Sequence, residues 1–184
     1  MALSRLFIVI GLLLQATLLG SETSISERYG QAEANSKKLS QFEYLRGHWT
    51  ISMQSIDKKG QYTKLPTQFF LNAFYHDDHK TFQSISSSSK GFFSTDLRTY
   101  NRQTEKWQVL FLNATAQRWH TFNASLIDGE MTTIVVGGFS GKEAFDVKTV
   151  HSDIKSNSLT ATIYRSIDNQ QSWLPVLRMS YQRD

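Results

Sequence analysis

The chain has 184 residues and no cysteine, which excludes disulfide bonds, a thiolate nucleophile and a cysteine-based zinc site. Hydrophobic residues make up 40% of it, enough for a core to hold a single domain together without cross-links. The formal net charge of +4 comes from basic residues that are spread along the chain, which argues against a nucleic-acid-binding surface.

The first residues have the pattern of a secretory signal peptide. Arg5 precedes an apolar run that extends to Leu19, and the small residues Gly20 and Ser21 follow it. The apolar stretch of roughly 14 residues, which Gln15 interrupts, is shorter than the roughly 20 that a membrane-spanning helix needs. We therefore expect residues 1–21 to be removed and the mature protein to be secreted, periplasmic or extracellular, without stable insertion in a membrane.

The remaining chain divides at about residue 42. Residues 22–41 are polar with a few apolar side chains at helical spacing, so we expect a short N-terminal helix or arm. In residues 42–184, β-branched and aromatic residues alternate with polar ones in short runs. Turn signals, such as Asp128-Gly129, separate these runs.

This pattern predicts an all-β domain of about nine or ten short strands. No segment between the runs is long enough for the helix that joins parallel strands, so the strands are expected to be antiparallel. A closed barrel leaves no sheet edge exposed. We therefore expect a single antiparallel up-and-down β-barrel of about 8–10 strands, with a β-sandwich as the alternative.

Gly47-His48-Trp49, at the start of the first expected strand, resembles the Gly-x-Trp signature of lipocalins and the wider calycins. In that fold the Trp closes one end of the barrel, and a basic side chain from the last strand packs across its ring. The resemblance implies structural roles for Gly47 and Trp49. It also points to Arg178, on the last expected strand, as the cation above the ring.

A longer pattern extends the resemblance over about residues 40–183. Its motifs are Phe42-x-Tyr-Leu-x-Gly-x-Trp49, Arg98-Thr-Tyr-Asn-x5-Trp107, Trp119, Ser166-x-Asp168-x4-Trp173 and Met179-x-Tyr-x-Arg183. This pattern is similar to a family of small, often bacterial, lipocalin-like proteins classed as a domain of unknown function. The likeness implies a calycin-type barrel and no particular activity.

The segment from Ser166 to Trp173 also resembles the Asp-box of sialidases and related propellers. In those proteins the Asp bonds the backbone of a hairpin turn, and the Trp packs beneath the turn. A single copy in a chain of this length cannot build a propeller. We therefore expect Asp168 and Trp173 to have a structural role in a hairpin.

The lumen of the expected barrel is the predicted ligand site. Strand alternation must point half of the side chains of the middle strands inward, and an apolar lumen with a few polar groups is the usual form of a small-molecule site. The candidate ligand-binding residues are Arg98, Tyr100, Trp107, Trp119, His120 and Phe122. For each of them an outward or purely core position is the alternative.

No catalytic, metal-binding or cofactor-binding residue is assigned. The nucleophile-elbow, phosphate-loop and dinucleotide motifs are absent from the sequence. The most metal-like cluster, His76-Asp-Asp-His79, lies in a polar loop where the ligand geometry is not fixed, so we expect a solvated turn. Asn113 and Asn123 each begin a glycosylation tripeptide, which matters only in a eukaryotic secretory pathway.

These features favour a secreted, non-catalytic protein that binds a small hydrophobic or amphipathic molecule. One alternative is an enzyme on the same barrel, of isomerase, cyclase or hydratase type, with His120 and either Arg98 or Tyr100 as its acid–base pair. The other is a structural or protein-interaction role, which would follow from a filled lumen. A homodimer is left open.

Overall fold

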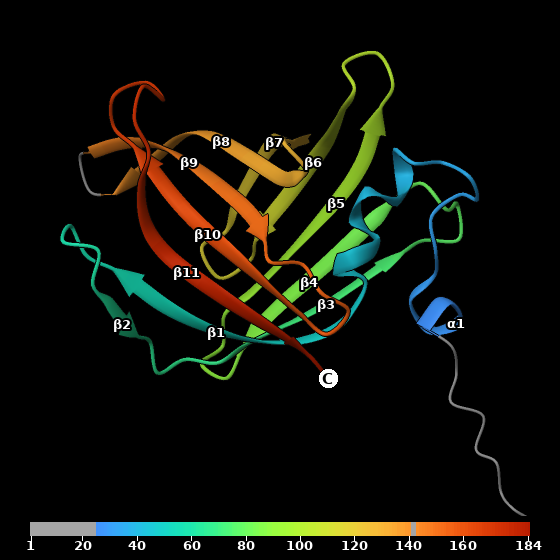
Figure 1. The fold of residues 1–184 in the computed structure, drawn as a ribbon, viewed down its shortest axis with the longest axis horizontal. Helices are drawn as coiled ribbons and strands as arrows, with labels where there is room; N and C mark the ends of the chain where they lie inside the picture. Colours follow the sequence, from blue (N-terminus) through green and yellow to red (C-terminus); the bar gives the residue numbers. More distant parts are fainter. Residues whose placement is uncertain (1–24, 141–142) are drawn as a thin grey trace, which may run out of the picture.

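The structure, a computed structural model, describes residues 25–140 and 143–184 (Figure 1). The predicted signal peptide lies outside the described residues. A short helix, α1 (Ile25–Tyr29), and a 3-10 helix, η1 (Leu39–Leu45), precede the strands. Within the described ranges, no helix has the length and apolar character needed to cross a membrane.

The described residues form eleven strands. They are β1 (Gly47–Ile56), β2 (Tyr62–Lys64), β3 (Phe69–Tyr75), β4 (Phe82–Ser88), β5 (Phe93–Asn101), β6 (Lys106–Asn113), β7 (Arg118–Ile127), β8 (Glu130–Ser140), β9 (Glu143–Ser152), β10 (Ser158–Ser166) and β11 (Leu174–Arg183).

Antiparallel pairing closes the sheet into a barrel. From β3 to β11 each strand pairs with the next in sequence, β1 pairs with β3, and β11 returns to pair with β1. The short β2 pairs with β1 outside this ring. The predicted all-β, antiparallel, up-and-down barrel with a short N-terminal helix is confirmed, and the β-sandwich is excluded.

Strand alternation decides which side chains form the core. Along β3, Leu71, Ala73 and Tyr75 are buried while the residues between them are half-exposed. β1 repeats the pattern, with Trp49 and Ile51 buried. Because successive side chains of a strand point to opposite faces, the odd-numbered residues of both strands face the barrel interior.

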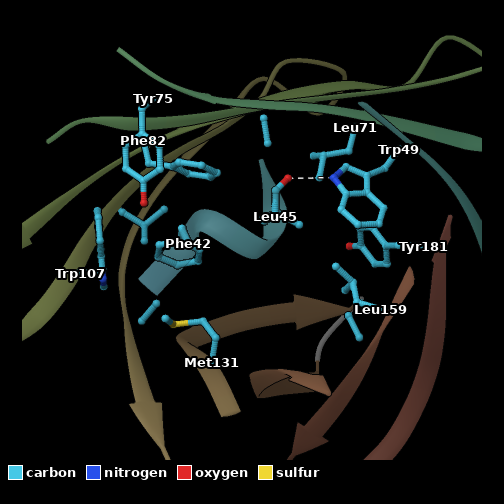
Figure 2. Close-up of a cluster of buried hydrophobic side chains, with 14 of the residues drawn as sticks. Phe42, Leu45, Trp49, Leu71, Tyr75, Phe82, Trp107, Met131, Leu159 and Tyr181 are labelled. Carbon is cyan, nitrogen blue, oxygen red and sulfur yellow. Dashed lines mark hydrogen bonds between the residues drawn. The ribbon is translucent and has the colours of Figure 1, made fainter. Parts of the chain in front are cut away.

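One end of the barrel is closed by η1, which Figure 2 shows in the middle of the buried side chains. Phe42 stacks on Phe82, with ring centroids 5.3 Å apart, and meets Trp107 edge-on at 5.0 Å. The indole N–H of Trp49 donates a 2.8 Å hydrogen bond to the carbonyl of Leu45. Each large apolar side chain buried here stabilises the fold by roughly 1.5–3 kcal/mol.

The cation above Trp49 is Arg183, not Arg178, so that prediction is wrong. The guanidinium carbon of Arg183 lies 4.1 Å from the centroid of the Trp49 ring, and the two residues are register partners in β1 and β11. Arg178 is half-exposed, with its guanidinium 4.0 Å from the carboxylate of Asp153. The two arginines are an odd number of residues apart on β11, so alternation places them on opposite faces.

Arg183 also explains why position 47 is a glycine. Its guanidinium donates hydrogen bonds to the backbone carbonyls of Arg46 and Tyr44, the second at 3.1 Å. A Cβ atom at Gly47, where φ is +122°, would overlap the Nη1 atom of Arg183. The Gly-x-Trp signature is therefore one packing unit in which the glycine makes room for the cation that covers the Trp.

The turn between β10 and β11 has hairpin chemistry. The carboxylate of Asp168 accepts hydrogen bonds from the Ser166 hydroxyl at 2.6 Å and from the Ser172 backbone N–H at 3.0 Å, which hold its pKa at about 2. Trp173 is half-exposed, and the Lys148 ammonium lies 4.8 Å from the centroid of its ring. Both residues therefore contribute to local structure.

Candidate functional site

A cavity of about 340 Å³ occupies the barrel interior next to η1. Most of its wall is apolar and comes from strands all around the ring, including the side chains of Met53, Phe69, Phe111, Phe122 and Ile163, with Phe92 from the turn before β5. Its volume is at the lower end of the range for small-molecule sites. The lumen is therefore not filled. A structural or protein-interaction role was expected only for a barrel with a filled lumen.

A group of polar side chains meets on the η1 side of this cavity. We call it the polar cluster, and its members are Tyr44, Ser84, Asp96, Arg98, His151 and Tyr181. Asp96 and Arg98 are two residues apart on β5 and so share its inner face, and Ser84 of β4 is the register partner of Asp96. Tyr44 comes from η1, His151 from β9 and Tyr181 from β11.

Arg98 and Asp96 form a buried ion pair. The Arg98 Nε atom donates to Oδ1 of Asp96 at 2.7 Å, and its Nη2 donates to Oδ2 at 2.9 Å. The Ser84 hydroxyl joins them by donating to Asp96 at 2.7 Å. The guanidinium carbon lies 4.4 Å from the centroid of the Phe42 ring, so the pair packs directly on η1.

The Arg98 guanidinium stays charged although the side chains of Arg98 and Asp96 are only 13% and 11% exposed. Burial disfavours the charge on Arg98, but the charge and hydrogen bonds of Asp96 outweigh burial and raise the pKa of the guanidinium. Bidentate, charge-assisted geometry is the arrangement in which a buried pair compensates for its lost hydration.

Tyr44 and His151 form a second polar pair. The Tyr44 hydroxyl is 2.5 Å from Nδ1 of His151, and the rings meet edge-on with centroids 5.7 Å apart. Burial, reinforced by the nearby charge of Arg98, lowers the pKa of His151 to about 3. Burial also raises the pKa of Tyr44, and it raises the pKa of Tyr181 to about 12. All three side chains are therefore uncharged near neutral pH.

The low pKa of His151 predicts a loss of stability in mild acid. As the pH falls below 6.5, the unfolded chain binds a proton at this side chain, whereas the folded protein resists protonation until about pH 3. The stabilisation that comes from keeping His151 uncharged is present above pH 6.5 and is lost as the pH falls from 6.5 to about 3. We expect the fall in the free energy of unfolding, measured by urea denaturation at a series of pH values, to be clearly shallower in His151→Asn.

The exposed His79 supplies the matched control. His79→Asn removes a histidine whose Nδ1 bonds the Gln31 carbonyl at the surface, and asparagine tolerates the positive φ of 57° found there. This variant is expected to keep the wild-type slope. A His151→Asn protein that loses stability as steeply as the wild type would show that His151 is not the group responsible.

The predicted ligand-binding residues separate into two groups. Arg98 and Phe122 line the cavity. Tyr100 lies on the same face of β5 but packs edge-on against Trp107 in the closed end, with centroids 5.7 Å apart. Trp107 is fully buried there and donates a 3.0 Å hydrogen bond to the Gln41 side chain. Tyr100 and Trp107 therefore support the η1 end of the barrel.

Trp119 and His120 stand apart from the polar cluster. Trp119 is 64% exposed and lies on the outer face of β7, because it is an odd number of residues from the inward-facing Phe122. The ring of His120 lies 6.5 Å from that of its register partner Phe111. The histidine that the fold brings to Arg98 is His151 instead.

Sequence reasoning did not assign site roles to Tyr44, Ser84, Asp96, His151 or Tyr181. A signal for Asp96 was present, since a carboxylate two residues before an inward-facing arginine on one strand must share its face. Tyr44 and Tyr181 stood inside the quoted motifs without a role. His151 offered no local signal, because its partner Tyr44 is 107 residues away.

The loop predicted to be a solvated turn makes hydrogen bonds of its own. His76 Nε2 lies 2.9 Å from the Gln83 side-chain oxygen, and Asp78 accepts hydrogen bonds from the backbone N–H groups of Lys80 and Thr81. In the described part of the chain, no group of three or more histidines and carboxylates is placed to hold a metal ion.

No family model and no curated protein matches the chain. Among solved structures, it is similar to the S-type phycobiliprotein lyase CPES from Guillardia theta, with a TM-score of 0.51 and 11% identity over 78% of this chain and 90% of that chain. The fold is a calycin-like barrel. The predicted membership of a lipocalin-like family of unknown function is not supported by a match to any family model.

A redesigned β-barrel, mFAP0, bound to DFHBI, also matches, with a TM-score of 0.37 and 12% identity over 76% of this chain and 99% of that chain. A TM-score this low does not establish a shared fold.

Proposed function

We propose that this protein binds a small hydrophobic or amphipathic molecule in the lumen of its barrel. The observation that carries the proposal is the cavity of about 340 Å³, with an apolar wall and a polar cluster at its η1 end. The wall stabilises a ligand by removing its apolar surface from water, at roughly 25 cal/mol per Å². The polar cluster supplies the few hydrogen-bonding groups that orient a ligand in such a site.

The polar cluster is poorly suited to acid–base catalysis, which an enzyme on this barrel would need. A general base works best when its pKa is near the operating pH, whereas burial lowers that of His151 to about 3. Burial raises the pKa values of Tyr44 and Tyr181, so both hydroxyls stay protonated near neutral pH. Asp96 is occupied by Arg98 and Ser84. Binding without chemical conversion is therefore the function that we propose, with no cofactor.

We further propose that the protein acts after export from the cytoplasm. The segment from Arg5 to Ser21 supports this part of the proposal, through its basic start, apolar run and small residues at the expected cleavage point. N-terminal sequencing of the protein recovered outside the cytoplasm tests it, and a mature chain that begins near residue 22 is the expected result.

Two measurements test binding. The natively purified protein is expected to show a native mass that exceeds its denatured mass by that of a small molecule. The emptied protein is expected to bind a neutral fluorescent probe such as 1-aminoanthracene. Binding should weaken at least about tenfold in Thr133→Trp, because the new indole occupies the cavity that Thr133 lines.

Thr121→Trp is the matched control, because Thr121 is exposed on the outer face of the neighbouring strand β7. This variant is expected to bind the probe as the wild type does. Probe binding that survives Thr133→Trp, or a natively purified protein that carries nothing and binds no probe, would contradict the proposed function.

A further inference from the structure

Among the described residues, the side chains that line the cavity carry no net charge. The charged side chains that line the cavity are Asp96 and Arg98, whose formal charges of −1 and +1 sum to zero. The lumen-facing His151 is uncharged near neutral pH because burial lowers its pKa to about 3. An anion that entered this space would therefore meet a guanidinium whose charge a carboxylate already balances.

At least two hydrogen-bonding groups of the polar cluster are left for a ligand. Arg98 uses Nε and Nη2 on Asp96 and Ser84, and no described residue accepts a hydrogen bond from its Nη1. His151 bonds Tyr44 through Nδ1, and its Nε2 has no partner among the described residues. Both side chains line the cavity. The N–H groups on Nη1 of Arg98 require an acceptor, so the fitting ligand atom is an oxygen with a free lone pair.

We propose that the lumen selects an uncharged ligand, an apolar molecule that ends in a carbonyl or hydroxyl oxygen, over the same molecule ending in a carboxylate. This inference rests on the proposed function. A carboxylate would give up its hydration on entering and gain no unbalanced positive charge in return. It would also approach the carboxylate of Asp96, and two like charges in one buried site destabilise each other.

Competition for bound 1-aminoanthracene tests the selectivity. The two competitors are methyl nonanoate and decanoate, which have the same number of carbon atoms and differ in charge. At neutral pH we expect the ester to displace the probe at a concentration at least about tenfold lower. Equal or tighter binding of decanoate would overturn the inference while leaving the proposed function intact. Failure of every competitor and of the probe would overturn both.

The substitution Asp96→Asn tests the cause. It keeps the shape of the side chain and an acceptor oxygen for Arg98 but removes the balancing charge, so the preference is expected to shift toward decanoate by about tenfold or more. Asp77→Asn is the matched control, because Asp77 is exposed in the turn after β3, and its selectivity should equal that of the wild type. A folded Asp96→Asn protein with unchanged selectivity would contradict the charge-balance explanation. If this variant does not fold, the wild-type ratio of ester to carboxylate still decides the inference.

Discussion

Trp49→Ala is expected to lower the free energy of unfolding by about 3–5 kcal/mol. The indole is fully buried, donates its N–H to the Leu45 carbonyl, and carries the Arg183 guanidinium on its face. Removing it leaves a cavity between β1, β11 and η1 and takes away the surface on which Arg183 packs. Urea denaturation followed by circular dichroism measures the loss, which should appear as a lower midpoint with an unchanged slope.

Trp119→Ala is the control, because it removes an exposed tryptophan instead of a buried one. Its side chain is 64% exposed on the outer face of β7, so a change of about 0.5 kcal/mol or less is expected. Similar losses in the two variants would show that Trp49 does not close the barrel end in the way the structure describes.

The second large effect is expected at the buried ion pair. Asp96→Ala should destabilise the protein by about 3–5 kcal/mol, because it leaves the Arg98 guanidinium in the interior without its counter-charge. The double variant Asp96→Leu with Arg98→Met replaces both charges with apolar groups of similar size. It is expected to recover most of the loss, to within about 1–2 kcal/mol of the wild type.

The comparison of Asp96→Ala with the double variant also tests why the Arg98–Asp96 ion pair is present. If the double variant is as stable as the wild type but binds ligand more weakly, the pair serves recognition rather than folding. A double variant as unstable as Asp96→Ala would contradict the ion-pair account. It would indicate that packing of Arg98 on Phe42 and Phe82 matters more than charge balance.

The proposed selection of an uncharged ligand and the stability of the empty barrel would both depend on the buried ion pair. The Arg98–Asp96 pair supplies a directional donor to the lumen without leaving a net charge there. A lone arginine in this position would be costly to bury and would favour anions. In our proposal, the pair decides which chemical class the lumen accepts, and it packs on η1 at that end of the barrel.

Much of the fold was predictable because it depends on local periodicity. Alternation with a period of two identified antiparallel strands, and Gly47-x-Trp49 located the closed end of the barrel. The prediction that Arg178 lies above the Trp49 ring was wrong, although strand alternation on β11 also points to Arg183. Arg183 shares its face with Met179 and Tyr181, which face the interior, and Arg178 does not.

The site was less predictable, because it is assembled from parts of the chain that no local pattern connects. Alternation identifies Asp96 and Arg98 as neighbours on one face of a strand, yet it cannot show whether that face is the inner one. Trp119, His120 and Phe122 were all candidates. Alternation separates Trp119 from the other two, but only the closed barrel shows that Phe122 lines the cavity and that His120 does not.

The sequence by itself determined an all-β chain of antiparallel neighbours with a Gly-x-Trp closure, because side-chain periodicity and turn chemistry act over a few residues. Only the tertiary structure decided that β11 meets β1, that Tyr44 of η1 reaches His151 of β9, and that a cavity remains above them. Those features depend on ring closure and on the summed volumes of side chains from distant strands, which no local segment specifies.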